Sequence, residues 1–230
     1  MMSIFKKILK FLPNRKNIGS AGPNSKIEFP VYVAAPEALQ MEENSLIRQG
    51  TKIINAPYEK VLIRKYTVVG VNCTIVTNGH RSTVGVPHIL LGASHINDKS
   101  CSIEIGEDVW IGVNVTILAG ANLGRGCIVG AASTVTKPVP PYALVVGSPA
   151  KIVGVKFSID QIIKHEKCLY PKGERLSKEY LVKLFEDYYE GKKVFGVETE
   201  LGHVEQDKLR EAMRARNFIS NSFVENMYGW

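Results

Sequence analysis

The sequence predicts a mainly-β fold, a β-solenoid in which short strands wind into stacked coils. Aliphatic residues recur at every sixth position from 105 to 135, and a second register four positions later holds only small or compact residues. A period of six matches neither the 3.6 residues of an α-helical turn nor the two-residue alternation of a strand. It fits a three-sided column whose coils complete each other's core. The aliphatic register contains Ile105, Ile111, Ile117, Leu123, Val129 and Val135.

The same phase extends toward the N-terminus. Ile63, Val69 and Ile75 keep it, and the gap from Ile75 to Ile105 is a multiple of six. Before residue 60 the period is looser, because Leu39 is followed by a slip to Leu46 and Ile53. A helical reading of 105–145 fails, since glycine follows the aliphatic position at 106, 112, 124 and 130 and β-branched residues are frequent.

Three segments are expected along the chain: a basic amphipathic N-terminal segment (1–22), the solenoid (23–155) with an inserted loop (80–102), and a C-terminal helical extension (156–230). Ser158 followed by Gln161 predicts a capping box. Ser177 is expected to cap a second helix that ends before Gly191, and a third helix is expected over 203–216.

The N-terminal segment alternates large apolar and lysine side chains as a short amphipathic helix would. Two readings stay open for it: packing on the base of the solenoid, or contact of residues 2–16 with a membrane surface. It lacks the long apolar stretch and cleavage site of a signal peptide. The apolar face contains Ile4, Phe5, Ile8, Leu9 and Leu12, and the basic side contains Lys6, Lys7 and Lys10.

Composition excludes several classes of protein. The 230 residues are 45% hydrophobic and 22% charged, as in a folded domain, and no apolar run is long enough to cross a bilayer. The four cysteines form no CxxC pair, which favours free thiols in a reducing compartment. A net charge of +7 indicates an anionic partner, but the lysines are scattered without interleaved aromatic residues, so nucleic acid is not expected.

Sequence motifs resemble one family. The run IGEDVWIGVNVTILAGANLGRGCIVGAASTVTKPVPPYALVVGSPAKIV (105–153), with NGHR at 78–81, DVWIG at 108–112 and VKFS at 155–158, resembles the hexapeptide-repeat acetyltransferases, in particular their xenobiotic and polysaccharide O-acetyltransferase branch. The resemblance implies a left-handed parallel β-helix, acetyl-CoA as co-substrate without a metal, and a homotrimer whose sites lie between subunits.

A general base is the main chemical requirement of acetyl transfer, and histidine suits that role. The family places its catalytic histidine in an Asn/Gly-His-Arg context, which here is His80; His95 and His88 are the alternatives. His165 and His203 fall on predicted helices and are expected to be surface histidines with satisfied hydrogen bonds. Cys73 and Cys127 fall in the compact register and are expected to pack rather than react; no acyl-enzyme is required.

Trp110 lies one position before Ile111 and should therefore point outward. Related enzymes use this tryptophan near the thioester, while packing between subunits explains it equally well. The resemblance also implies five CoA-contacting positions on the late coils. Serine is common at the position of Val113, and an arginine often stands where this chain has Gly154, so fewer groups could contact the phosphates, or that contact could shift to Lys156. The five positions are Val113, Ala131, Thr136, Lys137 and Lys151.

The interruption at 80–102 begins beside the favoured base and is interpreted as part of the acceptor pocket. Asn78, Arg81 and His95 are the candidate substrate-binding residues, with Ser82, Asn97 and Asp98 as further side chains able to hydrogen-bond a sugar.

Together these features predict an acetyl-CoA-dependent O-acetyltransferase, with a hydroxyl or amine of a carbohydrate in bacterial surface polysaccharide biosynthesis as acceptor. An antibiotic acceptor is the alternative, although HEKCLYPKGERL (165–176) replaces the tryptophan-rich segment of antibiotic-modifying relatives. A zinc lyase of the carbonic-anhydrase type, using His80, His88 and His95, is the alternative of another class. A cytoplasmic location is expected, with attachment to the inner face of the membrane as the alternative.

Overall fold

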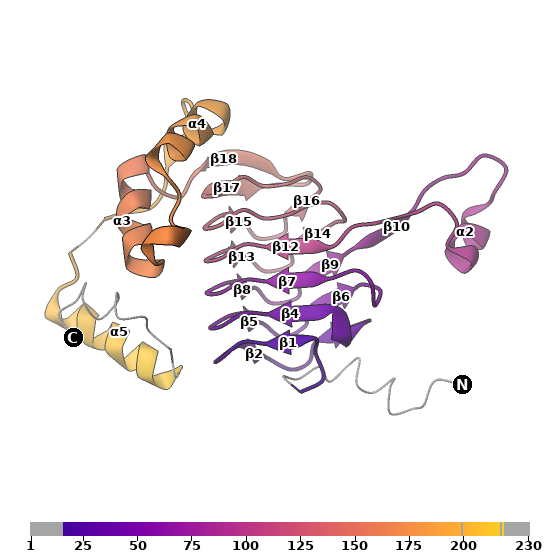
Figure 1. The fold of residues 1–230 in the computed structure, drawn as a ribbon, viewed down its shortest axis with the longest axis horizontal. Helices are drawn as coiled ribbons and strands as arrows, with labels where there is room; N and C mark the ends of the chain where they lie inside the picture. Colours follow the sequence, from indigo (N-terminus) through magenta and orange to yellow (C-terminus); the bar gives the residue numbers. More distant parts are fainter. Residues whose placement is uncertain (1–15, 199, 217, 219–230) are drawn as a thin grey trace.

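A computed structural model describes residues 16–198, 200–216 and 218 of the chain (Figure 1). The amphipathic helix expected near the N-terminus lies outside the described residues, apart from Lys16. From residue 20 onward the chain winds as coils of short strands, and strands stacked in successive coils form three sheets. Within these sheets every pair of neighbouring strands is parallel except β17 with β18, so the fold is the mainly-β solenoid that the period predicts.

The sheets are named here after one strand of each. The β12 sheet contains β1 (Ser20–Ala21), β4 (Leu39–Met41), β7 (Val61–Ile63) and β12 (Ile103–Ile105). The β14 sheet contains β3 (Tyr32–Val33), β6 (Lys52–Ile54), β9 (Thr74–Val76), β14 (Thr116–Ile117) and β16 (Thr134–Val135). The β13 sheet contains β2 (Lys26–Ile27), β5 (Leu46–Ile47), β8 (Val68–Val69), β13 (Trp110–Ile111), β15 (Ile128–Val129), β17 (Ala143–Val146), β18 (Lys151–Val155) and β19 (Lys193–Val194).

Both six-residue registers point into the column. Ile111 is directly in register with Val69 below it and Val129 above it, and all three are buried. In the compact register, Cys73 and Cys127 are buried free thiols, as expected. Full burial of one such aliphatic side chain contributes roughly 1.5–3 kcal/mol, and stacked coils supply it repeatedly.

Corners of the column require backbone that turns sharply in little space. Asn72 and Asn114 occupy the same corner of successive coils and both adopt left-handed backbone, at φ of 57°, which asparagine tolerates well. A side chain at Gly112 would place its Cβ 2.7 Å from the backbone nitrogen of Ala131 in the next coil. This close approach explains why glycine follows the aliphatic position.

The expected slip before residue 60 is wrong, and its correction is informative. Met41 pairs with Ile63, and the buried register continues in steps of six through Ile47 to Ile53. The additional residues fall instead at the turns from the β14 sheet to the β12 sheet, where η1 (Pro36–Ala38) and the segment 55–60 are inserted. Every interruption up to residue 105 therefore lies at one corner of the column.

The C-terminal extension begins with two helices, α3 (Ile159–Leu169) and α4 (Lys178–Tyr188), joined through η2 (Lys172–Glu174). Ser158 and Gln161 form the expected capping box, and Ser177 caps α4 by accepting a hydrogen bond from the Tyr180 N–H. The third helix, α5 (His203–Ala215), follows separately. In the part of the chain that the structure describes, none of the helices combines the length and the apolar character needed to cross a membrane.

A buried carboxylate attaches α3 to the corner between the β12 and β13 sheets. Glu166, 1% exposed, accepts hydrogen bonds from Arg125 (3.3 Å) and from the Tyr142 hydroxyl (3.0 Å). Arg125 also forms an ion pair with Glu107 at 3.2 Å. The helices therefore cover one side of the column, while a hairpin-like projection leaves it on the other side (Figure 1).

Candidate active site

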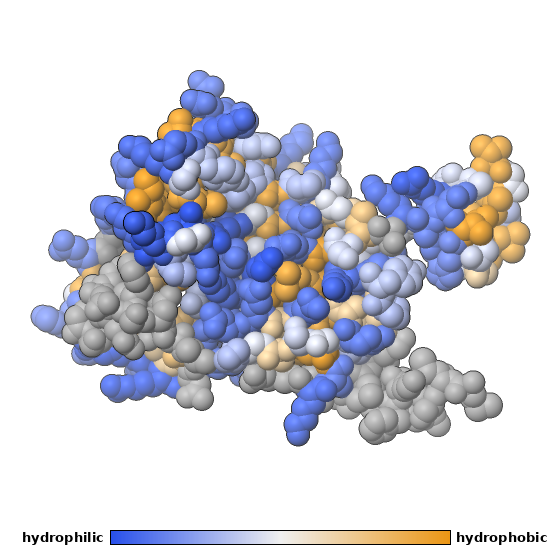
Figure 2. All heavy atoms as spheres, viewed as in Figure 1, coloured by the Kyte–Doolittle hydropathy of each residue, from blue (hydrophilic) through white to orange (hydrophobic). Residues whose placement is uncertain are grey.

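The projection, here called the arm (78–100), replaces the expected irregular loop with ordered structure. It leaves the column after β9 and returns to β12, at the corner where the other insertions lie. Strands β10 (Asn78–His80) and β11 (Asp98–Ser100) pair antiparallel, and α2 (His88–Ser94) closes the far end. Figure 2 shows apolar spheres gathered at the end of the arm; its exposed apolar side chains are Val84, Ile89, Leu90 and Ile96.

The hairpin register brings the favoured base against a carboxylate. His80 lies directly opposite Asp98 in the β10–β11 pair, a placement that puts the two side chains within contact distance. The His80 Nδ1 lies 2.7 Å from one Asp98 oxygen, and the His95 Nδ1 lies 2.8 Å from the other. Asp98 therefore connects the first and second candidate bases.

Helix α2 positions His95. Leu91 is buried and anchors the helix, and its carbonyl accepts a 2.8 Å hydrogen bond from the His95 backbone N–H. His95 ends the helix in left-handed backbone at φ 55°, which turns the chain toward Asp98. The third candidate, His88, lies instead 3.3 Å from the Ser82 hydroxyl, so within one chain the cluster contains two histidines and an aspartate rather than three histidines.

Hydrogen bonding sets the charge and proton positions of this cluster. The bond from His80, and then that from His95, holds the pKa of Asp98 below its ordinary value, so its carboxylate is ionised at neutral pH. Since a carboxylate can only accept, each Nδ1 that bonds to it carries a proton. In the neutral imidazole of His80 the Nε2 is then an acceptor, which is the form that a general base requires.

Space beside this nitrogen is kept open by a glycine. A Cβ built at Gly92 in α2 would lie 3.7 Å from the His80 Nε2, so the absence of a side chain there leaves room for a substrate group. The His80 side chain is 37% exposed, against 16% for Asp98. A hollow of about 600 Å³ adjoins the pair and is lined by Arg81, Ser82, Thr83, Val84, Asn97 and Asp98.

Asn78 lies with His80 in β10, whereas Trp110 and the predicted CoA-contacting residues lie on the column rather than in the arm. Trp110 is 61% exposed on the β13 sheet, whereas the arm leaves between the other two sheets. Val113 and Ala131 are exposed at the corner that follows β13 and β15. Thr136 and Lys137 are also exposed, but they follow β16 and therefore share the corner of the arm.

Lys151 is exposed at the start of β18, consistent with a mobile phosphate contact, whereas Lys156 already has an ion-pair partner. Its Nζ lies 2.6 Å from an Asp108 carboxylate oxygen. A shift of phosphate contact from the position of Gly154 to Lys156 would have to break this ion pair, so the pairing favours the other expectation, that fewer groups contact the phosphates.

Asp98 is the member of this candidate site whose contacts the sequence did not reveal. It was expected only as one of several side chains able to bind a sugar. Its position three residues after His95 is a weak signal, and its contact with His80 depends on a hairpin register that no period marks.

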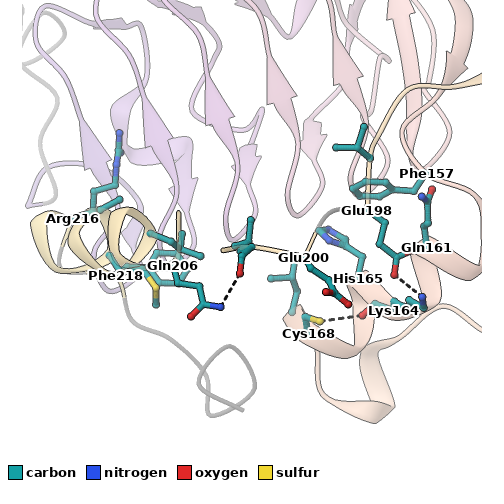
Figure 3. A pocket seen from close by; sticks show the side chains of 16 residues that line it. Phe157, Gln161, Lys164, His165, Cys168, Glu198, Glu200, Gln206, Arg216 and Phe218 are labelled. Carbon is teal, nitrogen blue, oxygen red and sulfur yellow. Dashed lines mark hydrogen bonds and ion pairs between the residues drawn. The ribbon is translucent and has the colours of Figure 1, made fainter. Parts of the chain in front are cut away.

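A larger cavity, of about 800 Å³, lies between α3 and α5, away from the arm (Figure 3). Its lining is mostly apolar, and Lys164 pairs with Glu198 at its edge at 2.5 Å. His165 faces it, but the Nε2 of His165 lies 3.0 Å from Asp108. This is the satisfied hydrogen bond expected for His165, so the cavity contains no predicted site residue.

Comparisons with known proteins bear on the fold and the family rather than on individual site residues. A family model described as bacterial transferase hexapeptide (six repeats) matches residues 102–137. A relative from Schizosaccharomyces pombe, provisionally named an acetyltransferase, is 35% identical over 106 residues, 42% of this chain and 51% of the relative. A Lysinibacillus sphaericus protein named "Probable macrolide acetyltransferase" is 52% identical over 58 residues, 25% of this chain and 32% of that protein. The chain thus spans about half, or less, of the length of these relatives.

Solved structures extend the likeness over more of the chain. A galactoside acetyltransferase in complex with coenzyme A superposes with a TM-score of 0.56 at 25% identity, covering 77% of this chain and 80% of that chain. This neighbour implies that the coils wind with the left hand expected from the sequence.

Proposed function

We propose that this chain, which belongs to the hexapeptide-repeat acetyltransferase superfamily, transfers an acetyl group from acetyl-CoA to a hydroxyl or amine of a carbohydrate. The observation that carries the proposal is His80, held through its Nδ1 by Asp98, with its Nε2 beside open space on an exposed arm. A base oriented in this way is what acetyl transfer requires from side chains.

In the proposed reaction, the His80 Nε2 accepts the proton of the acceptor group as its oxygen or nitrogen attacks the thioester carbonyl. The new bond forms to the carbonyl carbon, and the carbon–sulfur bond breaks as the tetrahedral intermediate collapses. His80 then returns the proton to the departing CoA thiolate. Asp98 keeps the Nδ1 proton in place and stabilises the transient imidazolium, and backbone N–H groups stabilise the oxyanion.

A homotrimer with sites between subunits accounts for the separation of the predicted residues. Trp110 and Val113 are exposed on one side of the column and the arm lies at another corner, so a second copy is needed to bring the arm of one chain near the tryptophan of the next. Burial in such a contact also explains a large exposed aromatic side chain. Acetyl-CoA would then lie in the groove between two columns, with contacts from Val113, Ala131, Thr136, Lys137 and Lys151.

The carbohydrate acceptor, and a role in surface polysaccharide biosynthesis, are supported by the galactoside acetyltransferase neighbour. A macrolide acceptor is the second candidate, favoured by the name of the Lysinibacillus relative. Against it stands the segment 165–176, which packs α3 against the column rather than supplying a tryptophan-rich surface. Location in the cytoplasm, with or without membrane contact through residues 2–16, belongs to the same proposal.

An acceptor screen tests the function directly. The purified chain is incubated with acetyl-CoA and panels of sugars, nucleotide sugars and macrolides, and released CoA thiol and acetylated product are both measured. We expect acceptor-dependent thiol release that is lost in His80→Ala and retained in His203→Ala, a matched exposed histidine. Turnover equal in both variants would contradict the assignment of the base, and failure to bind CoA at all would contradict the proposed function.

A further inference from the structure

The His80–Asp98–His95 cluster has the composition of a metal site as well as that of an oriented base. One candidate ligand atom from each of the three side chains lies within 4.8 Å of the others. We propose that the arm binds a divalent transition-metal ion, with zinc as the best match, through His80, His95 and Asp98, and that the bound ion reversibly switches off acetyl transfer. The second half of this proposal rests on the proposed function.

The ligand set favours zinc on chemical grounds. Two imidazoles and one carboxylate are the ligands of open zinc sites, in which water takes the fourth position. Ligand atoms around tetrahedral zinc lie roughly 3.3 Å apart, and those of the cluster lie within 4.8 Å of one another, so binding requires each pair to approach by at most about 1.5 Å. The His80 and His95 rings, with centroids 5.6 Å apart, are exposed enough to make this movement by side-chain rotation.

The charges around the cluster limit its affinity for a metal ion. Asp98 supplies one negative charge, while Arg81 lines the same hollow and opposes a cation. Lys99 follows Asp98 in β11 and therefore points to the opposite face of the hairpin. We expect a dissociation constant on the order of micromolar, suited to inhibition that responds to the free ion rather than to a permanent cofactor.

The switch follows from the position of one proton. With Asp98 as partner, the Nδ1 of His80 carries the proton and its Nε2 is free to accept another. A metal ion on Nδ1 takes the lone pair of that atom, so the neutral ring must carry its proton on Nε2. The nitrogen that would accept the proton of the acceptor group is then already protonated. Binding also removes Asp98 from its role as the partner of the Nδ1 proton.

Calorimetric titration with zinc chloride tests the site on the full chain without acetyl-CoA, so the result does not depend on activity. We expect one zinc per chain, with an affinity at least about tenfold weaker in His95→Gln. The matched control is His88→Gln, which removes an imidazole from the same arm but outside the cluster and should change the affinity by less than about twofold. Absence of binding at about 1 mM zinc, or equal weakening in both variants, would overturn the site.

The switch is tested separately, by transfer of a radiolabelled acetyl group, because zinc binds the CoA thiol and would disturb a thiol assay. Zinc should suppress transfer by the wild-type chain over the concentration range in which calorimetry detects binding, and EDTA should restore it. Transfer that continues with the site filled would overturn the regulatory half. A chain that binds zinc through His95 but transfers no acetyl group would instead contradict the proposed function and leave the metal site standing.

Discussion

Among the described residues, two aspartates pair with histidine, and their surroundings differ. The arm pair, His80 with Asp98, projects from the column, whereas the corner pair, His165 with Asp108, lies where α3 meets the column. Burial raises the pKa of Asp108, but the hydrogen bond from His165 and the charge of Lys156 outweigh it and the pKa is lowered. Both carboxylates are therefore ionised at neutral pH.

The two pairs differ in whether a nitrogen of the imidazole remains accessible to another group. At the corner, one Asp108 oxygen receives both the His165 Nε2 and the Lys156 ammonium, and the neighbouring Phe157 ring lies 5.0 Å from the imidazole. In the arm, each Asp98 oxygen accepts a hydrogen bond from one imidazole, and the second nitrogen of His80 faces Gly92, which has no side chain. The same two residue types thus attach a helix in one place and hold the proposed base in the other.

Removing the imidazole from each pair should produce opposite results, and this is the largest effect we expect. His80→Ala should lower kcat about 10²–10⁴-fold while changing the free energy of unfolding by less than about 0.5 kcal/mol. His165→Ala should leave kcat within about twofold but lower the free energy of unfolding by about 1 kcal/mol. Steady-state kinetics and urea unfolding measure the two quantities. Loss of activity in both variants would mean that the corner pair also serves the reaction.

Loss of a buried charge should lower the free energy of unfolding most at the corner between the β12 and β13 sheets, where α3 meets the column. Glu166→Ala leaves Arg125 and the Tyr142 hydroxyl without their buried acceptor and removes the partner of the Leu176 N–H, 2.5 Å away. We expect the free energy of unfolding to fall by about 3–5 kcal/mol.

The control for this prediction is Glu174→Ala, which removes an exposed carboxylate paired with Lys65 at 2.7 Å. Urea titration should show a loss of less than about 1 kcal/mol for this variant. Similar losses in the two variants would indicate that the corner network contributes no more than a surface ion pair.

Within the arm, Asp98→Asn separates positioning from binding. An asparagine amide can donate to the His80 Nδ1, which would favour the tautomer with its proton on Nε2, the wrong nitrogen for a base. We expect kcat to fall about 10–100-fold with the KM for acetyl-CoA unchanged, because the proposed cofactor contacts lie on the coils. An unchanged kcat would show that His80 acts without its carboxylate partner.

The sequence predicts best those parts of the fold that are built from repeated units. The column repeats one pattern many times, because Ile105, Ile111 and Ile117 each occupy the same position in the six-residue repeat. The outward direction of Trp110 follows from its place in that repeat. An insertion at a corner resembles a loss of phase: because η1 lies between Val33 and Met41, Leu39 falls six positions after Val33 by coincidence and the slip seems to follow it.

A contact between two residues far apart in the chain occurs once and leaves no repeated pattern, so the sequence does not reveal it. The contact of His80 with Asp98 depends on a hairpin register without periodic signal, and the pairing of Lys156 with Asp108 joins positions 48 residues apart. Both contacts follow from the three-dimensional structure alone, whereas His80 itself could be proposed as the base from the NGHR motif.

The smallest effect we expect comes from filling the space beside the His80 Nε2, the feature that distinguishes the arm pair from the corner pair. At Gly92 a methyl group would lie at ordinary contact distance from the His80 Nε2, so Gly92→Ala should retain activity and stabilise α2 by up to about 1 kcal/mol. Gly92→Leu adds three further carbons next to the nitrogen and should raise the KM for the acceptor or lower kcat by about tenfold in total. Acceptor-saturation kinetics on the two variants measure this, and thermal unfolding checks that both remain folded. Because alanine controls for helix propensity, only leucine tests the open space. Equal activity in the two variants would mean that the acceptor reaches His80 from a direction other than α2.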